Sequence, residues 1–384
     1  HGMVVAVLQG NGYRWLGELI ERCHEEPKKK GRLRRQAAER FRSLRQAGIV
    51  ELTRERESGR YAVRVNEDLQ RDFSLHQTLS LYLVEALEVL DREEPSYPLD
   101  LLSLVEAVLE DPVPILRQQV SKLKTELLAQ LKADRVPYEE RIEKLDQVEH
   151  PKPNADFIYA SFEIFAEKHP WTSQENIRPK SVAREMVESY SRFDSYVQLY
   201  GLQRSEGLLL RYLGQVYGTL SRSVPDAAKS DEIHDILAYL RTLIERVDSS
   251  LFEEWERQLR PEAERVGGAE TAPLPKLDLA LTPKAFRARV RSEMRELVRA
   301  LSERDYEEAA RWVRQDPDDR WDAVRFAEAL APFHDEYERI LFDPGARQAH
   351  RTAIRQTAPR VWEVQQVLAD PEGDDIWSVQ GEID

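Results

Sequence analysis

Near the N-terminus, apolar residues recur at helical spacing and are followed by two short segments that alternate between apolar and polar residues. The helical spacing predicts three helices, over Met3–Leu8, Tyr13–His24 and Arg32–Gln46. The alternation predicts two strands, over Ile49–Arg54 and Arg60–Val65, around a turn at Glu57-Ser58-Gly59. Three helices followed by a two-stranded ribbon indicate a winged helix, which we place at residues 1–70.

A long helical pattern follows, which we assign to a helical bundle body at residues 71–260. Its predicted helices are Leu75–Leu90, Leu99–Leu109, Pro112–Asp134, Tyr138–Glu149, Phe157–Lys168, Ser181–Tyr200, Gly201–Leu220, Asp231–Val247 and Ser250–Leu259. Prolines and paired glycines then predict a linker at residues 261–281. The pattern indicates one continuous helical body, without a repeat of the solenoid kind.

The remaining residues, 282–384, predict a small α+β tail. Its helices are expected at Pro283–Ala300, Asp305–Gln315 and Trp321–Leu330, and its strands at Ala349–Gln356, Val361–Ala369 and Ile376–Ile383. Helices followed by an antiparallel meander suggest a cone-like fold, similar to that of nuclear transport factor two. The fold class is therefore mainly α, with this tail as its β-containing part.

Charged residues are unevenly distributed along the chain. The whole chain of 384 residues has a net charge of -14, which would disfavour binding to nucleic acid. Residues 1–66, however, hold 15 Lys and Arg against 8 Asp and Glu, a net charge of +7. The other 41 basic and 62 acidic residues leave -21 for the rest. A phosphate senses charges within about 10 Å. For binding to nucleic acid, the positive charge of the N-terminal module therefore matters more than the net charge of the whole chain.

The cysteine content and the absence of long apolar runs indicate the compartment in which we expect the protein. The single cysteine, Cys23, excludes an intramolecular disulfide framework, and no apolar run reaches the length of a membrane span. We therefore expect a cytoplasmic protein without membrane contact. The start His1-Gly2-Met3 suggests either that Met3 is the natural start or that the chain was cut from a longer protein.

Several known catalytic patterns are missing or misleading. No phosphate-binding loop, zinc-ligand spacing or nucleophile elbow occurs. Asp231-Glu232-Ile233-His234 spells a helicase motif, but its position after Ser230 favours the opening of a helix. Trp171, in Lys168-His169-Pro170-Trp171, could stack on a base, although we favour a core or loop-anchoring role. We expect no cofactor and no catalytic residue in this chain.

Two groups of residues are candidates for binding nucleic acid. The first is a basic cluster in the predicted third helix and the residues before it: Lys28, Lys29, Lys30, Arg32, Arg34, Arg35, Arg40, Arg42 and Arg45. Such a cluster neutralises phosphates without reading sequence, although a solvated helix face or a surface docked on an acidic domain would look the same.

The second group lies between Gln203 and Arg222. On a regular helix, the stripe residues would be Arg204, Arg211, Gln215 and Arg222, with Gly207 and Gly218 beside them. Leucines and other apolar residues occupy the opposite face, and Glu206 would point toward that face and need a buried partner. Glycines within a helix suit the close approach of another backbone, either a packed helix or a nucleic-acid strand.

The same segment resembles a known family. It is similar to the Glu-Gly-x-Leu-x-Arg helix of superkiller-like helicases, which are DEAD/DEAH-box proteins of superfamily 2. The similar residues are Tyr200-Gly201-Leu202-Gln203-Arg204-Ser205-Glu206-Gly207-Leu208-Leu209-Leu210-Arg211. It resembles more closely the uncharacterised domain that follows the motor in many bacterial members. Further matching stretches are Tyr97–Ala107, Lys132-Ala133-Asp134, Tyr138–Arg141, Pro151-Lys152-Pro153, His169-Pro170-Trp171, Val247–Leu251 and Asp370–Gly373.

This resemblance implies an accessory module of an ATP-dependent helicase. In that family the winged helix packs on RecA-like motor lobes, and the Glu-Gly-x-Leu-x-Arg helix lies under a departing single strand. The implied strand-facing residues are Arg204, Gly207, Arg211 and Gln215. ATP and Mg²⁺ would bind only at the motor lobes, whose motifs this chain lacks. The family pattern also continues beyond the last predicted strand, so we expect the tail to be incomplete.

The expected function is therefore to guide single-stranded RNA or DNA for the motor, as a monomer. Three alternatives remain open: a winged-helix transcriptional regulator with an effector or dimerisation body, a protein-interaction scaffold, and an enzyme with its site in the tail.

Overall fold

The structure, a computed structural model, describes residues 16–54, 61–65, 79–247, 283–316 and 319–383. It is mainly helical, with a small three-stranded antiparallel sheet near the C-terminus. The chain divides into two compact units. Residues 1–230 with 243–274 form the first unit, and residues 231–242 with 275–384 form the second.

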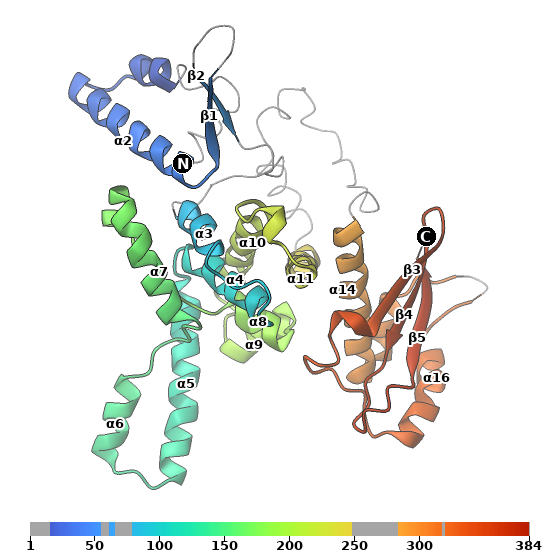
Figure 1. The fold of residues 1–384 in the computed structure, drawn as a ribbon. Helices are drawn as coiled ribbons and strands as arrows, with labels where there is room; N and C mark the ends of the chain where they lie inside the picture. Colours follow the sequence, from blue (N-terminus) through green and yellow to red (C-terminus); the bar gives the residue numbers. More distant parts are fainter. Residues whose placement is uncertain (1–15, 55–60, 66–78, 248–282, 317–318, 384) are drawn as a thin grey trace. The chain divides into compact units, whose positions relative to one another are not determined.

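The N-terminal part of the first unit contains a long helix and a two-stranded ribbon (Figure 1). Residues 16–22 are helical. Helix α2 spans Pro27–Gln46 and therefore begins before the predicted Arg32, because proline with its fixed φ suits the first helical position. Strands β1 (Val50–Arg54) and β2 (Tyr61–Val65) pair antiparallel, with Val50 opposite Val65. The predicted first helix and hairpin turn lie outside the described residues.

The helices of the body follow the predicted periodicity closely. Their bounds are α3 Ser80–Leu87, α4 Tyr97–Ala107, α5 Val113–Ala133, α6 Tyr138–Asp146, α7 Ala155–Lys168, α8 Ala183–Ser189, α9 Phe193–Tyr200 and α10 Glu206–Arg222, with a 3-10 turn η1 at Pro170–Gln174 and another, η2, at Asp226–Ala228. The next helix, α11 (Asp231–Val247), is predicted as part of the body, but its residues 231–242 belong to the second unit. The predicted linker at 261–281 and the helix at Ser250–Leu259 lie outside the described residues.

The prediction of one helix over Ser181–Tyr200 is wrong. The chain forms two helices, α8 and α9, because Tyr190 adopts a left-handed conformation with φ 50°. Such a residue ends the α8 hydrogen-bond ladder in the way that glycine usually does. Gly201, with φ 61°, then ends α9 by the same conformation.

The buried side chains of α3 and α4 form the centre of the body. Leu81, Leu83, Leu101, Leu102 and Leu104 are fully buried. Tyr82 contacts Phe162 and Phe165 of α7 edge-on, at 5.3 and 5.5 Å between ring centroids. The apolar contact between α3 and α7 places the end of α7, and the loop after it, beside the centre of the body.

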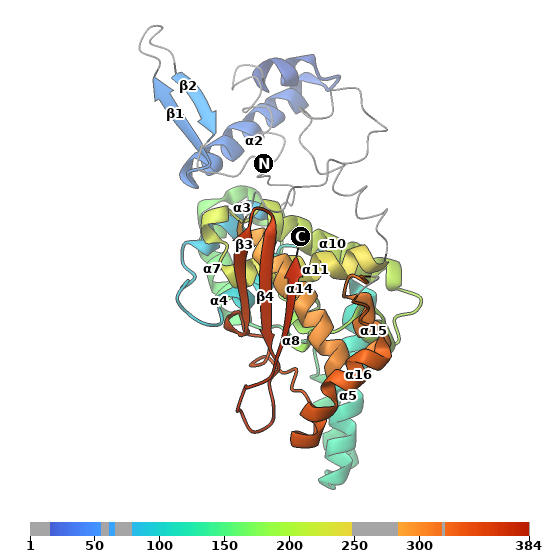
Figure 2. The same ribbon diagram turned by 90° about the vertical axis from the view of Figure 1, so that its right-hand side faces the viewer.

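The second unit combines helices α14 (Pro283–Ser302), α15 (Tyr306–Arg311) and α16 (Ala323–Glu336) with strands β3 (Thr352–Ala358), β4 (Val361–Val367) and β5 (Ser378–Ile383). Strand β4 lies between β3 and β5 in an antiparallel sheet (Figure 2). The 3-10 turn η4 (Ala349–Arg351) replaces the first residues of the predicted strand at Ala349–Gln356. The helical core centres on Leu301, Phe326 and Phe333.

A buried ionic cluster joins the first residues of α11 to α14 within this unit. Arg291 donates to both carboxylate oxygens of Asp235, at 2.5 to 3.0 Å, and Arg295 donates to Oδ2 at 2.7 Å. Asp231 and Glu232 occupy the first turn of α11, so the helicase-like string opens a helix, as the sequence indicated.

Candidate nucleic-acid interface

Helix α10 is held by a buried face that packs on α4. Leu209, Leu213 and Val216 are fully buried, as predicted for this side of the helix. Within the same face, the hydroxyl of Tyr212 donates a 2.9 Å hydrogen bond to Oε1 of Glu106 on α4. This polar contact fixes the rotation of α10 about its own axis, and with it the direction of the opposite face.

Glu106 joins three helices. Its carboxylate accepts the backbone N–H groups of Val182, Ala183 and Arg184, at 2.8 to 3.0 Å, so it caps the start of α8. The side chain is fully buried. Burial raises the pKa of the Glu106 carboxyl, against the opposing effect of these hydrogen bonds. A carboxyl that serves α4, α8 and α10 together is a structural centre of the body.

Lys180 makes the complementary contact at the end of α4. Its ammonium donates to the carbonyl oxygens of Glu106, Leu109 and Arg178, at 2.7 to 2.9 Å, and lies 3.2 Å from Asp111. Burial lowers the pKa of Lys180, and the nearby Asp111 opposes that shift. A cation at a helix C-terminus also interacts favourably with the helix dipole.

The face of α10 that is turned away from α4 is polar and exposed. Gly207, Arg211 and Gln215 are exposed, and the side chains of Arg211 and Gln215 have no hydrogen-bond or ion-pair partner within the described part of the chain. A Cβ atom added at Gly207 would meet nothing within 4 Å. Packing therefore does not require glycine at this position, and the backbone of the first helical turn is open to an external group.

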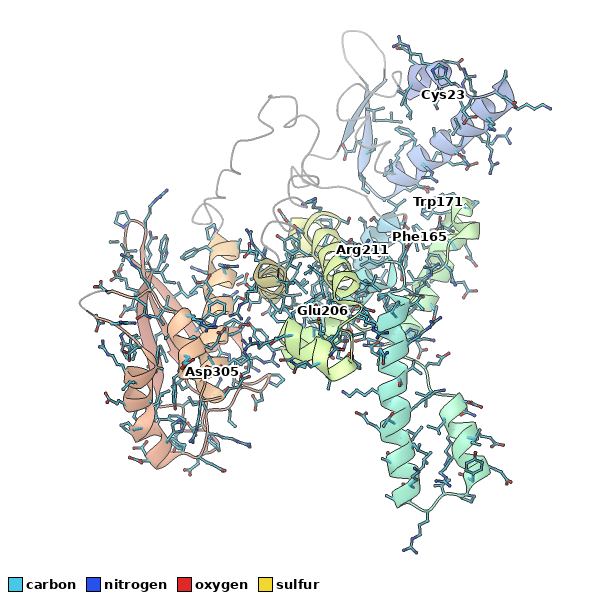
Figure 3. All side chains as sticks on the ribbon, turned by 180° about the vertical axis from the view of Figure 1, so that it is seen from behind. Cys23, Phe165, Trp171, Glu206, Arg211 and Asp305 are labelled. Carbon is cyan, nitrogen blue, oxygen red and sulfur yellow. The ribbon has the colours of Figure 1, made fainter. Side chains whose placement is uncertain are left out.

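The predicted stripe is wrong at both of its ends. Arg204 is exposed but lies before the helix, which begins at Glu206 after Ser205. Arg222 is buried, because the last turn of α10 is covered on several sides: Gly218, Thr219 and Leu220 are buried as well. Glu206, expected to need a buried partner, is exposed in the first turn, where the helix dipole favours an acid. Figure 3 shows Glu206 and Arg211 along α10.

Helix α2 carries the second group of predicted residues. Its sequence holds nine Lys and Arg against one acid, Glu39. Lys29 pairs with Glu25 at 3.0 Å, Arg34 pairs with Glu21, and Lys30 donates to the Glu21 carbonyl. The remaining exposed cations are Lys28, Arg32, Arg35, Arg42 and Arg45, and none of these has an ion pair among the described residues.

These cations occupy one side of α2. At 100° per residue, Lys28, Arg32, Arg35 and Arg42 fall within a single stripe, which also contains the half-buried Glu39. The stripe extends over about 20 Å of helix, since each residue rises about 1.5 Å. Such a row matches a line of phosphates rather than a single anion.

The C-terminal end of α2 is attached to the body through a buried polar chain. Ser43 Oγ lies 2.8 Å from Nδ1 of His169, and Nε2 of His169 lies 2.7 Å from Oε1 of Glu85 on α3. Trp171 donates from Nε1 to Ser43 Oγ at 3.3 Å, and the Arg40 guanidinium lies 5.7 Å from its ring centre. Both Ser43 and His169 are buried.

The hydrogen-bonded series of Ser43, His169 and Glu85 resembles a serine–histidine–carboxylate triad, but its serine is unsuited to catalysis. Ser43 is within a helix, is nearly inaccessible to solvent, and is covered by Trp171. We therefore assign the arrangement to docking of α2. The loop-anchoring interpretation of Trp171 is confirmed, because its ring also packs on Phe165 at 6.0 Å (Figure 3).

Sequence reasoning missed Glu106, Lys180 and the chain through His169. One signal was available for Glu106, which is an acid within an otherwise apolar helical run and therefore requires a buried partner. The partners of His169 are 126 and 84 residues away, and nothing in the local sequence indicates them.

The described residues contain no group of three or more His, Cys, Asp and Glu side chains that is placed to hold a metal ion. None of their helices is both long enough and apolar enough to cross a membrane.

The fold and the candidate interface define a mainly helical protein with a basic N-terminal helix and a helix anchored on a buried glutamate. By comparison with family models, the chain belongs over residues 1–384 to the family described as a domain of unknown function, DUF3516. No curated protein and no solved structure matches the chain.

Proposed function

We propose that this protein is an accessory nucleic-acid-binding and motor-docking module of an ATP-dependent RNA or DNA helicase. In this proposal, residues 1–70 are a winged helix and α10 is a ratchet-like helix beneath a single strand. The helical order and the β1–β2 pairing support the first assignment. The sequence resemblance and the open, polar face of α10 support the second.

One observation carries the proposal: α2 and the segment around the start of α10 both present exposed cations whose side chains form no ion pair with a described residue. They are Lys28, Arg32, Arg35, Arg42 and Arg45 on α2, together with Arg204 just before α10 and Arg211 within it. Cations that stabilise a fold are usually paired within it, whereas unpaired cations retain their hydration and can exchange it for phosphate contacts. Single-strand binding by such residues tolerates any base sequence.

The further parts of the proposal follow from the family resemblance. RecA-like motor lobes would hold ATP and Mg²⁺ and pull the strand, whereas this chain would guide it, as a cytoplasmic monomer. The second unit would have a cone-like tail fold with an undefined partner. The three-stranded sheet of that unit is consistent with this assignment.

Fluorescence anisotropy with a labelled single-stranded RNA tests the proposal. We expect salt-sensitive binding that the double substitution Arg204→Ala and Arg211→Ala weakens at least about fivefold, because two phosphate contacts are lost. The matched control is Lys132→Ala with Arg135→Ala, which removes two exposed cations from the end of α5. This control should leave the affinity within about twofold.

Other outcomes would favour other functions. Unchanged affinity in the Arg204/Arg211 variant would refute the role of α10. Tight, sequence-specific binding to duplex DNA by a dimer would instead support a transcriptional regulator, since a two-fold protein reads paired half-sites.

A further inference from the structure

A groove lies between the two helices of the α5–α6 hairpin, on a part of the body that the nucleic-acid proposal does not use. Figure 1 shows α5 and α6 side by side. The groove has a volume of about 360 Å³, and its walls include Val120 and Leu128 of α5 and Leu145 of α6. It is open to solvent, and helix α6 has no buried residue.

The charged residues of the groove are all basic. Arg117 and Lys124 are the only ionisable residues in its lining. Neither of them forms an ion pair with a described residue, whereas Lys122, on the same helix, pairs with Glu126 at 3.9 Å. Arg117 and Lys124 are seven residues apart, which places them on one side of α5 about 10 Å from each other.

Helix α6 extends the apolar surface beyond the groove. Tyr138 and Ile142 are 69% and 41% exposed, and they share a helix face with Leu145 because the spacing is i, i+4 and i+7. Arg141 lies on the same helix, 5.7 Å from the Tyr138 ring centre, and its buried Nε atom has no hydrogen-bond partner among the described residues.

The hairpin is fixed at its base. Gln119 of α5 is buried and donates to the Ser181 carbonyl at 2.6 Å and to Glu185 Oε2 at 2.8 Å. Glu185 also accepts hydrogen bonds from the hydroxyls of Tyr196 and Tyr200 of α9. The end of the groove near Arg117 and Val120 is thus attached to the body, so a partner would meet a preformed surface there.

We propose that this groove binds an acidic amphipathic helix of a partner protein. Apolar side chains of that helix would fill the space between Val120, Leu128 and Leu145. Two of its carboxylates, seven residues apart, would match Arg117 and Lys124, since both helices rise about 10 Å over that interval. A nucleic-acid backbone fits less well, because it would leave the apolar floor and the exposed Ile142 side chain uncovered.

A designed peptide provides the test. The probe is a labelled helix of about 18 residues, with leucines on one face and flanking glutamates seven residues apart. We expect saturable binding that Lys124→Glu weakens at least about tenfold, because one attraction becomes a repulsion. Ile142→Gln should weaken binding severalfold without affecting the fold, since this side chain is exposed. A probe whose glutamates are replaced by lysines should not bind.

The matched control is Lys132→Glu, which changes an exposed α5 cation outside the groove and should leave peptide affinity within about twofold. Circular dichroism would show that all variants stay folded. Equal loss of binding in Lys124→Glu and Lys132→Glu, or no binding of the acidic probe at all, would overturn the proposal.

Two further results would assign the groove to another occupant. A labelled single-stranded RNA that competes with the peptide and loses affinity in Lys124→Glu would overturn the proposal in favour of nucleic acid. A dimer that Lys124→Glu dissociates, measured by light scattering, would overturn it in favour of a second copy of the chain. Because these substitutions leave α2 and α10 intact, the strand binding described above should persist in all of them.

Discussion

Replacing Ser43 by alanine tests whether α2 is part of the body or only tethered to it. The hydroxyl of Ser43 lies 2.8 Å from His169 Nδ1 and 3.3 Å from Trp171 Nε1. His169 is 1% exposed, so water cannot replace the lost partner without opening the contact. The substitution therefore leaves a buried imidazole nitrogen and an indole N–H without their shared partner.

The expected loss of stability follows from the free-energy cost of leaving a buried polar group without a hydrogen-bond partner. A buried polar group that loses its hydrogen-bond partner costs about 1–3 kcal/mol, and the indole contact at 3.3 Å is the weaker of the two. We expect Ser43→Ala to lower the free energy of local opening at the end of α2 by about 2 kcal/mol. Since about 1.4 kcal/mol corresponds to a factor of ten, amide exchange there should become about 30 times faster.

Hydrogen-exchange mass spectrometry measures this directly in peptides that cover residues 40–50. The control is Ser189→Ala, which removes an exposed hydroxyl bonded to the Glu185 carbonyl and to Ser191. That variant should exchange at the wild-type rate in the same peptides. If Ser43→Ala changes exchange by less than about twofold, the polar chain does not hold α2, and the docking assignment is refuted.

Three more predictions concern stability and binding. Burial holds the pKa of Glu106 above its usual 4.5, so the folded state binds a proton more tightly than the unfolded state. The free energy of unfolding of the wild type should therefore fall, relative to that of Glu106→Gln, as the pH rises above 4.5. Urea unfolding between about pH 4 and 8 would measure this difference. A gain with rising pH would mean that the hydrogen bonds to the carboxylate outweigh its burial. Gly201→Ala should destabilise the body by about 1 kcal/mol in thermal unfolding, because φ 61° strains a residue with a Cβ; an unchanged melting temperature would contradict this. Arg32→Ala with Arg35→Ala should reduce the slope of log affinity against log salt for single strands by about 1.4, and an unchanged slope would exclude both residues from phosphate contact.

Most helices could be located from the sequence, because long amphipathic segments keep their period whatever they pack against. Helix α11 has the predicted bounds, and α5 differs by one residue at each end. The division between α8 and α9 could not be predicted, since the left-handed residue at the break is Tyr190, with neither glycine nor proline to mark it. The start of α10 did have a signal, because Ser205 before Glu206 is a typical helix opening.

The candidate interface could be predicted only in part. Exposure of Arg211 and Gln215 follows from the helical period, because an apolar face opposite them must be buried. Burial of Arg222 depends on the tertiary surroundings of the last turn, which the period of a single helix does not contain. The same limit applies to His169, whose partners come from α2 and α3.

In the proposed function, nucleic acid contacts both α2 and the residues around the start of α10. Photocrosslinking of a single-stranded RNA that contains 4-thiouridine, followed by mass spectrometry of the crosslinked peptides, tests it most directly. We expect crosslinks within residues 28–45 and 203–215, and their loss in high salt because the contacts are to phosphates. Crosslinks confined to other parts of the chain, or insensitive to salt, would contradict it.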